Sequence, residues 1–374
     1  MGRNVSEIPY DRIARQRAIT VSDVRAIWHE AARFDKSLKL KTGVTEALLN
    51  KRVQPSLFSR GKLFESMVGI EPSLFCRVPV RSRVLPAGQQ FSIVDEIRRG
   101  LPKSRRARVR TSESVNYTLI REVIDRWTKR DESIFSVTDL HYCGTRFDRR
   151  IDTNALNDFN LLRRGTDGFQ SQDSLVISSM GAVTDSHSDD HSGSNHSFVG
   201  AKLWLLWDTL EGLKYGLEDV ERCTVYERAA FDLAAFLRMR SSRWILIGSG
   251  QTMFVPAHLT HKVITLSPYF GLGSFHAALP GFCSLLNRWA VLPPLWASRR
   301  ANSASSVESL TRRAIGKIEK LKNANRRERY QWGMSYLRAS LERIDIFNAT
   351  ICDGSTSSCA ENLKRFVGAA RQAI

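Results

Sequence analysis

The sequence predicts an α+β fold in which a core of short β-strands lies between helical N-terminal and C-terminal regions. Apolar residues recur at helical spacing in residues 21–34 and 42–53, and again in residues 306–347. From about residue 137 to residue 281, short apolar runs alternate with polar breaks that contain Gly and Ser. Several short strands at such close spacing are typical of a β-sandwich or a β-barrel.

The change in pattern along the chain divides it into three parts. Residues 1–134 are expected to be a mainly helical N-terminal region that contains a basic segment at 98–110. Residues 135–296 are expected to form the β-barrel core, and residues 297–374 a C-terminal helical region.

Two more helices are expected close to the strands, at residues 117–135 and 225–240, where apolar residues again follow helical spacing. The second of them interrupts the series of strands. The expected strands are the apolar runs at residues 175–180, 197–207, 243–248, 252–257, 261–266 and 269–275.

Composition excludes several classes of protein. A chain of 374 residues with 42% hydrophobic residues is long enough to bury a substantial core. No apolar run is long enough to cross a membrane, and the first residues lack the apolar stretch of a secretory signal, so we expect no membrane association. The six cysteines are scattered and form no C-x-x-C pair, which favours reduced thiols in an intracellular protein over a zinc finger.

The formal net charge of +18 predicts an anionic partner. The densest basic runs are residues 98–110 and 317–329, and either could contact nucleic-acid phosphates or an acidic protein face. The alternative is a solvated basic surface without a partner. We therefore expect nucleic acid or chromatin as a possible partner, and a nuclear location in preference to a cytoplasmic one.

A pair of metal-ligand residue types, His187 and Asp189, precedes one of the expected strands. Residues i and i+2 of a strand point to the same face, so this pair can offer an imidazole and a carboxylate to one cation. His261 follows Pro256 and a short turn and is the candidate for the third ligand. Two histidines and one carboxylate form the facial triad of non-haem Fe(II) oxygenases, which leaves coordination positions open.

Other residues of the same types compete with these ligands. Asp190 is the alternative carboxylate, and His191 and His196 are alternative imidazoles, although a place at the mouth or in a loop is favoured for both histidines. Asp185 is expected in a turn. His276 follows a late strand, and whether it faces the pocket is left open.

Four segments resemble the JmjC family of Fe(II)- and 2-oxoglutarate-dependent dioxygenases of the cupin superfamily, over roughly residues 135–281. The first is the H-x-D pair, and the second is "VGAKLWLLW" at 199–207. The third is "GSGQTMFVPAHLTHKV" at 248–263, which is similar to the family's hairpin into the distal histidine. The fourth is "SIFSVTDL" at 133–140.

This resemblance implies a double-stranded β-helix, also called a jelly-roll or cupin barrel, that binds Fe(II) through His187, Asp189 and His261. It implies 2-oxoglutarate as co-substrate, held at its far carboxylate by Lys202 and Thr184. A buried lysine on a strand is costly unless a negative charge pairs with it, which favours such a role for Lys202. The alternatives are a solvent-facing lysine at a strand edge and an ordinary threonine at a strand end.

The activity implied by the resemblance is hydroxylation or N-demethylation of a protein side chain, with a protein as the expected substrate. Two other functions are alternatives. One is a catalytically silent JmjC-like scaffold that binds chromatin or RNA, and the other is a different metal-dependent cupin. C-terminal helices of the family sometimes dimerise, so residues 335–347 are a candidate dimer interface.

Overall fold

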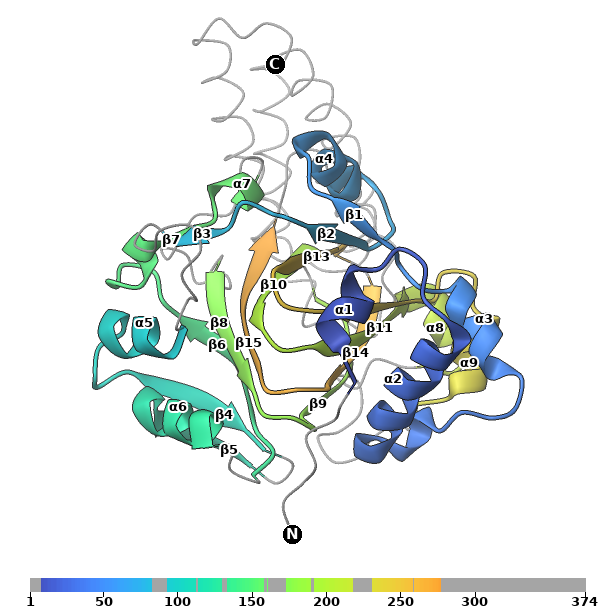
Figure 1. Cartoon of the computed structure of the whole chain (residues 1–374), viewed down its shortest axis with the longest axis horizontal. Helices are drawn as coiled ribbons and strands as arrows, with labels where there is room; N and C mark the ends of the chain where they lie inside the picture. The colour runs from blue at the N-terminus through green and yellow to red at the C-terminus, as the bar shows by residue number, and fades with distance from the viewer. Residues whose placement is uncertain are drawn as a thin grey trace, which may run out of the picture. The chain divides into compact units, whose positions relative to one another are not determined.

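Figure 1 shows the protein as a computed structural model. The structure describes residues 8–82, 93–111, 114–129, 133–157, 160, 173–189, 192–217, 231–257 and 259–276. The expected C-terminal helical region at 297–374, with its basic segment 317–329 and the candidate dimer interface 335–347, lies outside these residues. None of the described helices combines the length and apolar character that crossing a membrane requires.

Two mostly antiparallel sheets dominate a mixed α+β fold, so the expected α+β class is confirmed. The large sheet has nine strands in the order β1-β2-β13-β10-β15-β8-β6-β4-β5, and the small sheet has four in the order β12-β11-β14-β9. A separate ladder joins β3 and β7. The strands are β1 (Pro55–Leu57), β2 (Ser73–Cys76), β3 (Arg81–Ser82), β4 (Arg106–Arg110), β5 (Val115–Leu119), β6 (Ser136–His141), β7 (Ile151–Asp152), β8 (Asp173–Ser178), β9 (Val183–His187), β10 (Ser192–Val199), β11 (Lys202–Asp208), β12 (Arg243–Ile247), β13 (Gln251–Val255), β14 (Leu259–Thr265) and β15 (Tyr269–His276).

The last eight strands pair in a nested order. Strand β11 pairs with β12, β10 with β13, β9 with β14 and β8 with β15. In the sequence, the two strands of each pair therefore flank the pair named just before. Two of these pairs belong to the small sheet and two to the large one. The chain therefore passes repeatedly between the two sheets.

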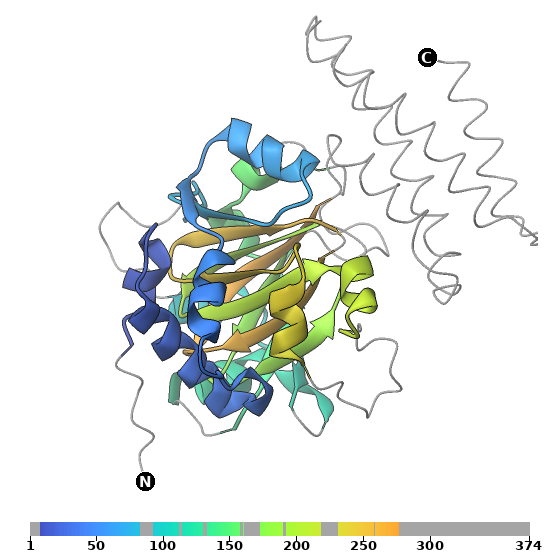
Figure 2. The same cartoon turned by 90° about the vertical axis from the view of Figure 1, so that its right-hand side faces the viewer.

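Helices cover the outer face of each sheet, as Figures 1 and 2 show. Buried residues of α1, α2, α3 and α9 share one core with the outer face of the small sheet, and buried residues of α5 and α6 share another with the large sheet. The helices are α1 (Tyr10–Arg15), α2 (Val21–Phe34), α3 (Val44–Asn50), α4 (Arg60–Val68), α5 (Ile93–Gly100), α6 (Ile120–Lys129), α7 (Asn154–Asn157), α8 (Thr209–Lys214) and α9 (Leu233–Arg238), with short 3₁₀ helices at Lys36–Leu38 and Asp148–Arg150.

A third core lies between the two sheets. It joins Leu206 and Ile247 of the small sheet to Val176, Met253 and Tyr269 of the large one. Because side chains alternate along a strand, the residues of β11 and β14 that share a face with these core residues point between the sheets. This inner face is where the candidate site lies.

The start of α2 is fixed by a capping box. The Thr20 hydroxyl accepts a hydrogen bond from the Asp23 backbone N–H at 3.1 Å, and the Asp23 carboxylate accepts from the Thr20 backbone N–H at 2.8 Å. Downstream, α2 buries Trp28, whose ring meets that of Trp244 in β12 edge to face. The cap thus holds the helix that covers the outer face of the small sheet.

Replacing Thr20 with alanine is expected to lower the free energy of unfolding by about 1 kcal/mol, because the Asp23 backbone N–H in the first helical turn loses the hydroxyl that accepts its hydrogen bond. Chemical denaturation measures this loss. Thr20→Ser keeps the hydroxyl and is expected to retain most of the stability, and equal losses in the two variants would contradict a capping role.

The helix expected at residues 117–135 is shorter than predicted. Residues Val115–Leu119 form β5, and α6 begins only at Ile120. The stretch "VNYTL" is rich in β-branched and aromatic residues, and it pairs along its whole length with β4. Pairing with a neighbouring strand therefore overrides the helical spacing. Of the helix expected at 225–240, the structure describes α9, and residues 225–230 lie outside the described part.

The N-terminal region contributes strands as well as helices, because β1, β2, β4 and β5 extend the large sheet at its two edges. The chain forms two compact units. The first comprises residues 1–66, 71–155 and 164–275, on both sides of the boundary expected near residue 134. The second comprises residues 67–70, 156–163 and 276–374.

Candidate metal centre

Two histidines meet across neighbouring strands of the small sheet. His187 at the end of β9 is directly opposite His261 in β14, and their ring centroids are 4.2 Å apart. Directly opposed residues of an antiparallel pair point to the same side. His261 is also opposite Leu206, which belongs to the core between the sheets, so both imidazoles lie on the inner face.

Asp189 joins the two histidines, two residues beyond His187. One ligand atom from each of the three side chains can be chosen so that all lie within 4.8 Å of one another. A carboxylate oxygen of Asp189 is 3.8 Å from Nε2 of His261. The structure therefore brings together the three residues predicted as ligands, across 74 residues of sequence.

Both rings form a hydrogen bond through Nδ1. Nδ1 of His187 is 2.8 Å from the carbonyl oxygen of Asp185, and Nδ1 of His261 is 3.2 Å from that of Leu259. A carbonyl oxygen can only accept, so each Nδ1 carries the proton and donates it. Such an outer hydrogen bond fixes the tautomer and the ring orientation of metal-binding histidines. The donor set of two neutral imidazoles and one carboxylate fits a divalent transition metal.

A β-bulge in β9 aligns Thr184 with this site. His187 faces His261 and Thr184 faces Val263, so three residues of β9 span two of β14. In a regular strand, residues three apart point to opposite faces. The extra residue brings the Thr184 and His187 side chains to the same inner face, as bulges near functional sites commonly do.

Lys202, at the start of β11, points to the inner face as well. It is opposite Ile247 of β12, a member of the core between the sheets. The side chain is buried, and burial lowers the pKa of its ammonium to about 7. Its ammonium lies 4.4 Å from the ring centroid of Tyr269, and among the described residues no carboxylate pairs with it.

A second buried lysine of the small sheet provides the contrast. Lys262 lies in β14 next to His261, but it points to the outer face and binds Asp35 at 2.9 Å and Asp185 at 3.2 Å. The fold therefore supplies two carboxylates to one buried lysine and, within the described residues, none to Lys202. A buried cation without a counter-charge is costly, which suits a site that takes an anion.

Polar groups of the large sheet lie on the inner face near Tyr269 and were not anticipated from the sequence. The Tyr269 hydroxyl donates a hydrogen bond to the side-chain oxygen of Asn195, and burial raises the pKa of Tyr269. The Ser178 hydroxyl is buried and has no hydrogen-bond partner among the described residues. The only sequence signal for these groups is a polar residue on an otherwise apolar strand, and that signal is common.

Two competing residues lie elsewhere than expected. Asp185 is not in a turn: it is in β9, where its carboxylate binds Lys262 and its carbonyl accepts from His187. His196 is neither at a mouth nor in a loop, because it is buried in β10 with Nδ1 2.7 Å from the Thr252 hydroxyl. Burial lowers the pKa of His196 to about 4, so the ring is neutral at physiological pH.

Three competitors remain. Asp190 and His191 lie outside the described residues. His276 is buried in the second unit, where Nδ1 lies 3.2 Å from the side-chain amide of Asn160.

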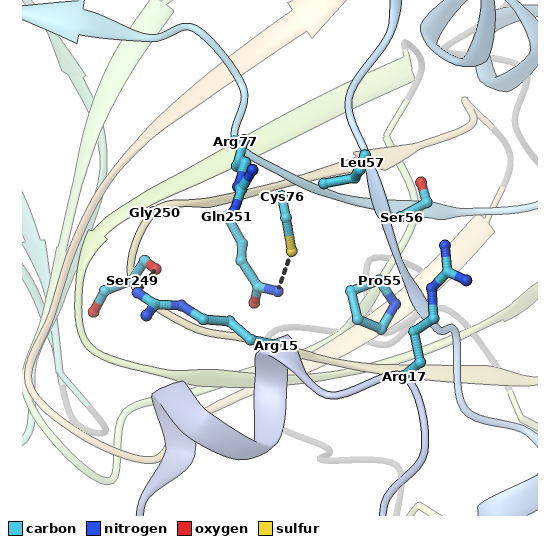
Figure 3. Close-up of a pocket in the computed structure, with 10 residues that line it drawn as sticks. All are labelled: Arg15, Arg17, Pro55, Ser56, Leu57, Cys76, Arg77, Ser249, Gly250 and Gln251. Atoms are coloured by element: carbon cyan, nitrogen blue, oxygen red, sulfur yellow. Dashed lines mark hydrogen bonds between the residues drawn. The ribbon is translucent and has the colours of Figure 1, made fainter.

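A groove of about 440 Å³ lies apart from these residues and shares none of them (Figure 3). Its lining includes Arg15, Arg17 and Arg77, with Cys76 and Gln251 joined by a hydrogen bond of 3.2 Å. The guanidinium groups of Arg15 and Arg17 lie at opposite sides of the groove in Figure 3, and that of Arg15 donates to the Ser249 carbonyl. The arginines therefore do not converge on one point.

Comparison with known proteins adds no relative: no protein-family model and no curated protein matches this chain. The site is therefore defined by its own geometry.

Proposed function

We propose that this protein is an Fe(II)- and 2-oxoglutarate-dependent oxygenase of JmjC type, built on a jelly-roll barrel. The nested pairing of β8 to β15 in two facing sheets supports the barrel. One observation carries the function: a cluster of two histidines and one carboxylate shares the inner face of the small sheet with a buried lysine that has no described counter-charge.

The metal would be held by Nε2 of His187, Nε2 of His261 and the carboxylate of Asp189. This set has few protein ligands and leaves positions for a co-substrate and for dioxygen. The carbonyls of Asp185 and Leu259 keep both rings in the tautomer that binds a metal.

The co-substrate would be oriented by Lys202 and Thr184. In the pairing of β11 with β14, Leu206 is opposite His261 and Lys202 is opposite Thr265. The backbone of Lys202 is therefore four residues along the strand, about 13 Å, from the histidine pair. A lysine side chain that reaches toward the metal leaves room for a short dicarboxylate between them. Its ammonium would meet the far carboxylate, and the Thr184 hydroxyl would donate to the same group.

When bound, Fe(II) and 2-oxoglutarate supply the oxidation of a substrate C–H bond by dioxygen, with release of succinate and carbon dioxide. The protein supplies orientation and a site shielded between two sheets. The substrate we propose is a protein side chain that is hydroxylated or loses an N-methyl group, in a nuclear or chromatin-associated setting.

His187→Ala is expected to abolish the visible charge-transfer band that 2-oxoglutarate produces on the anaerobic Fe(II)-loaded protein, because one of three metal ligands is lost. Absorption spectroscopy of the wild-type and variant proteins measures this band. The matched control is His196→Asn, which removes another buried histidine of the barrel and is expected to keep the band.

Three results would contradict the proposal. A folded wild-type protein without the band would favour a silent scaffold. Binding of a divalent metal without 2-oxoglutarate would favour another metal-dependent cupin. A band that persists in His187→Ala would exclude this residue as a ligand.

A further inference from the structure

Two arginines of the basic segment 98–110 form contacts within the fold. Arg98 forms an ion pair of 2.6 Å with Asp125 of α6, and Arg105 donates a hydrogen bond of 2.6 Å to the His141 carbonyl. Further along the segment, burial alternates strictly along β4, "RARVR". Ala107 and Val109 are buried in the core shared with α6, and Arg106, Arg108 and Arg110 point outward and are exposed.

The neighbouring strand β5 adds exposed apolar side chains to the same face. Arg108 is directly opposite Tyr117, and Arg110 is opposite Val115. Opposed residues point to the same side, so these side chains form one surface with Arg106, here called the arginine–tyrosine face. Tyr117 is 66% exposed and Val115 is 49% exposed, so both side chains are accessible to a partner.

The arginine–tyrosine face is backed by a buried core and carries charge of one sign. The back of β4 is anchored by buried contacts to α6, which lies beside β4 and β5 in Figure 1. The Arg106 guanidinium also reaches across the pair and donates to the Tyr117 carbonyl at 3.4 Å. Neither β4 nor β5 contains an acidic residue.

We propose that the arginine–tyrosine face binds single-stranded nucleic acid. Arginines at alternate positions of a strand are spaced by about 6.8 Å, so they follow an extended line of phosphates. An exposed aromatic ring among them offers a platform on which an unpaired base can stack. In a duplex the bases are already stacked on one another, so Tyr117 favours a single strand. This inference does not rest on the metal centre, and its test needs neither metal nor 2-oxoglutarate.

The test is binding of the full-length protein to a fluorescein-labelled oligouridine 12-mer, followed by fluorescence anisotropy. Tyr117→Ala is expected to weaken binding roughly 5- to 100-fold through loss of stacking. Tyr117→Phe keeps the ring and is expected to bind within about twofold of the wild type. Tyr117 is exposed, so both variants are expected to unfold at the wild-type temperature.

Charge is tested separately. Arg108→Gln is expected to weaken binding and to reduce the slope of log affinity against log salt by about 0.7, the contribution of one phosphate contact on a single strand. The matched control is Arg25→Gln on α2, an exposed arginine remote in sequence, with an expected change below about twofold. An oligothymidine of equal length tells whether the face distinguishes RNA from DNA.

Several outcomes would overturn the proposal. Absence of binding at low salt would do so, and so would equal effects of Arg108→Gln and Arg25→Gln, which would indicate diffuse charge attraction. If the protein binds a duplex as tightly as a single strand, and Tyr117→Ala does not weaken that binding, a stacking platform is excluded. Tighter binding of polyglutamate with the same sensitivity to Tyr117 and Arg108 would assign the face to an acidic protein.

Discussion

Replacing Lys202 with methionine is expected to stabilise the metal-free protein by about 1–4 kcal/mol at pH 7 and to abolish 2-oxoglutarate binding, a loss of about 100-fold or more. Methionine keeps an unbranched side chain of similar length beside Tyr269 without the buried charge. Chemical denaturation measures the first effect, and calorimetric titration of the anaerobic Fe(II)-loaded protein measures the second. Opposite signs for stability and binding are the signature of a cation retained for a ligand.

The stability effect of Lys202→Met has a defined pH dependence. Burial lowers the pKa of Lys202 from 10.5 to about 7 in the folded protein. Between these values the unfolded chain holds a proton that the folded protein has released, so the Lys202 contribution to stability improves as pH rises from 7 to about 10.5. The advantage of the methionine variant is therefore expected to be largest at and below pH 7 and to shrink toward pH 10.

Lys262→Met is the matched control, because Lys262 is a buried lysine of the same sheet that has two carboxylate partners. Its loss leaves Asp35 and Asp185 without their cation, so this variant is expected to be less stable than the wild type. If Lys202→Met also destabilises the protein at pH 7, the inference that Lys202 is a buried cation without a counter-charge is contradicted. Unchanged 2-oxoglutarate affinity would contradict its role in binding.

The H-x-D spacing and the turn before His261 were enough to predict which three ligand residues lie together. His187 and Asp189 are close in sequence, and His261 starts a strand after a recognisable Pro-containing turn. The bulge in β9 could not be predicted, because it depends on the register with β14 rather than on local sequence.

The surroundings of Lys202 were missed for a related reason. Tyr269 and Asn195 meet only because β15 and β10 are neighbours in the large sheet, and no local pattern encodes that neighbourhood. The strand β5 was mistaken for helix because Tyr117–Leu119 continue the apolar spacing of α6. Pairing partners far away in sequence decide such cases, and a single sequence does not reveal them.

Gly200→Ala is expected to destabilise the protein by about 3 kcal/mol or more. Gly200 lies between β10 and β11 with φ of +85°, where a side chain is strained, and an added Cβ would lie only 2.1 Å from the Pro268 carbonyl oxygen. That oxygen belongs to backbone, so the contact can be relieved only by moving the chain. Because Lys202 follows two residues later, such a shift is also expected to weaken 2-oxoglutarate binding. Thermal and chemical denaturation measure the stability loss.

Gly216→Ala separates the two causes. Gly216 also has a positive φ, +75°, but nothing lies within 4 Å of an added Cβ. Its substitution is expected to cost about 1 kcal/mol, the conformational part alone. Equal losses of stability in Gly200→Ala and Gly216→Ala would show that the close approach to Pro268 does not contribute to the destabilisation.

The nested pairing of β8 to β15 also has a consequence for how the chain acquires its site during folding. The innermost pair, β11 with β12, closes a shorter loop than β10 with β13, and β9 with β14 comes third. Loop closure costs more entropy as the loop grows, so we expect these pairs to form from the inside outward. His187 and His261 belong to the third pair, so a growing chain presents them together only after the two inner pairs have formed. The proposed metal would then meet a nearly finished protein, and its binding would stabilise the folded state without guiding the search for it.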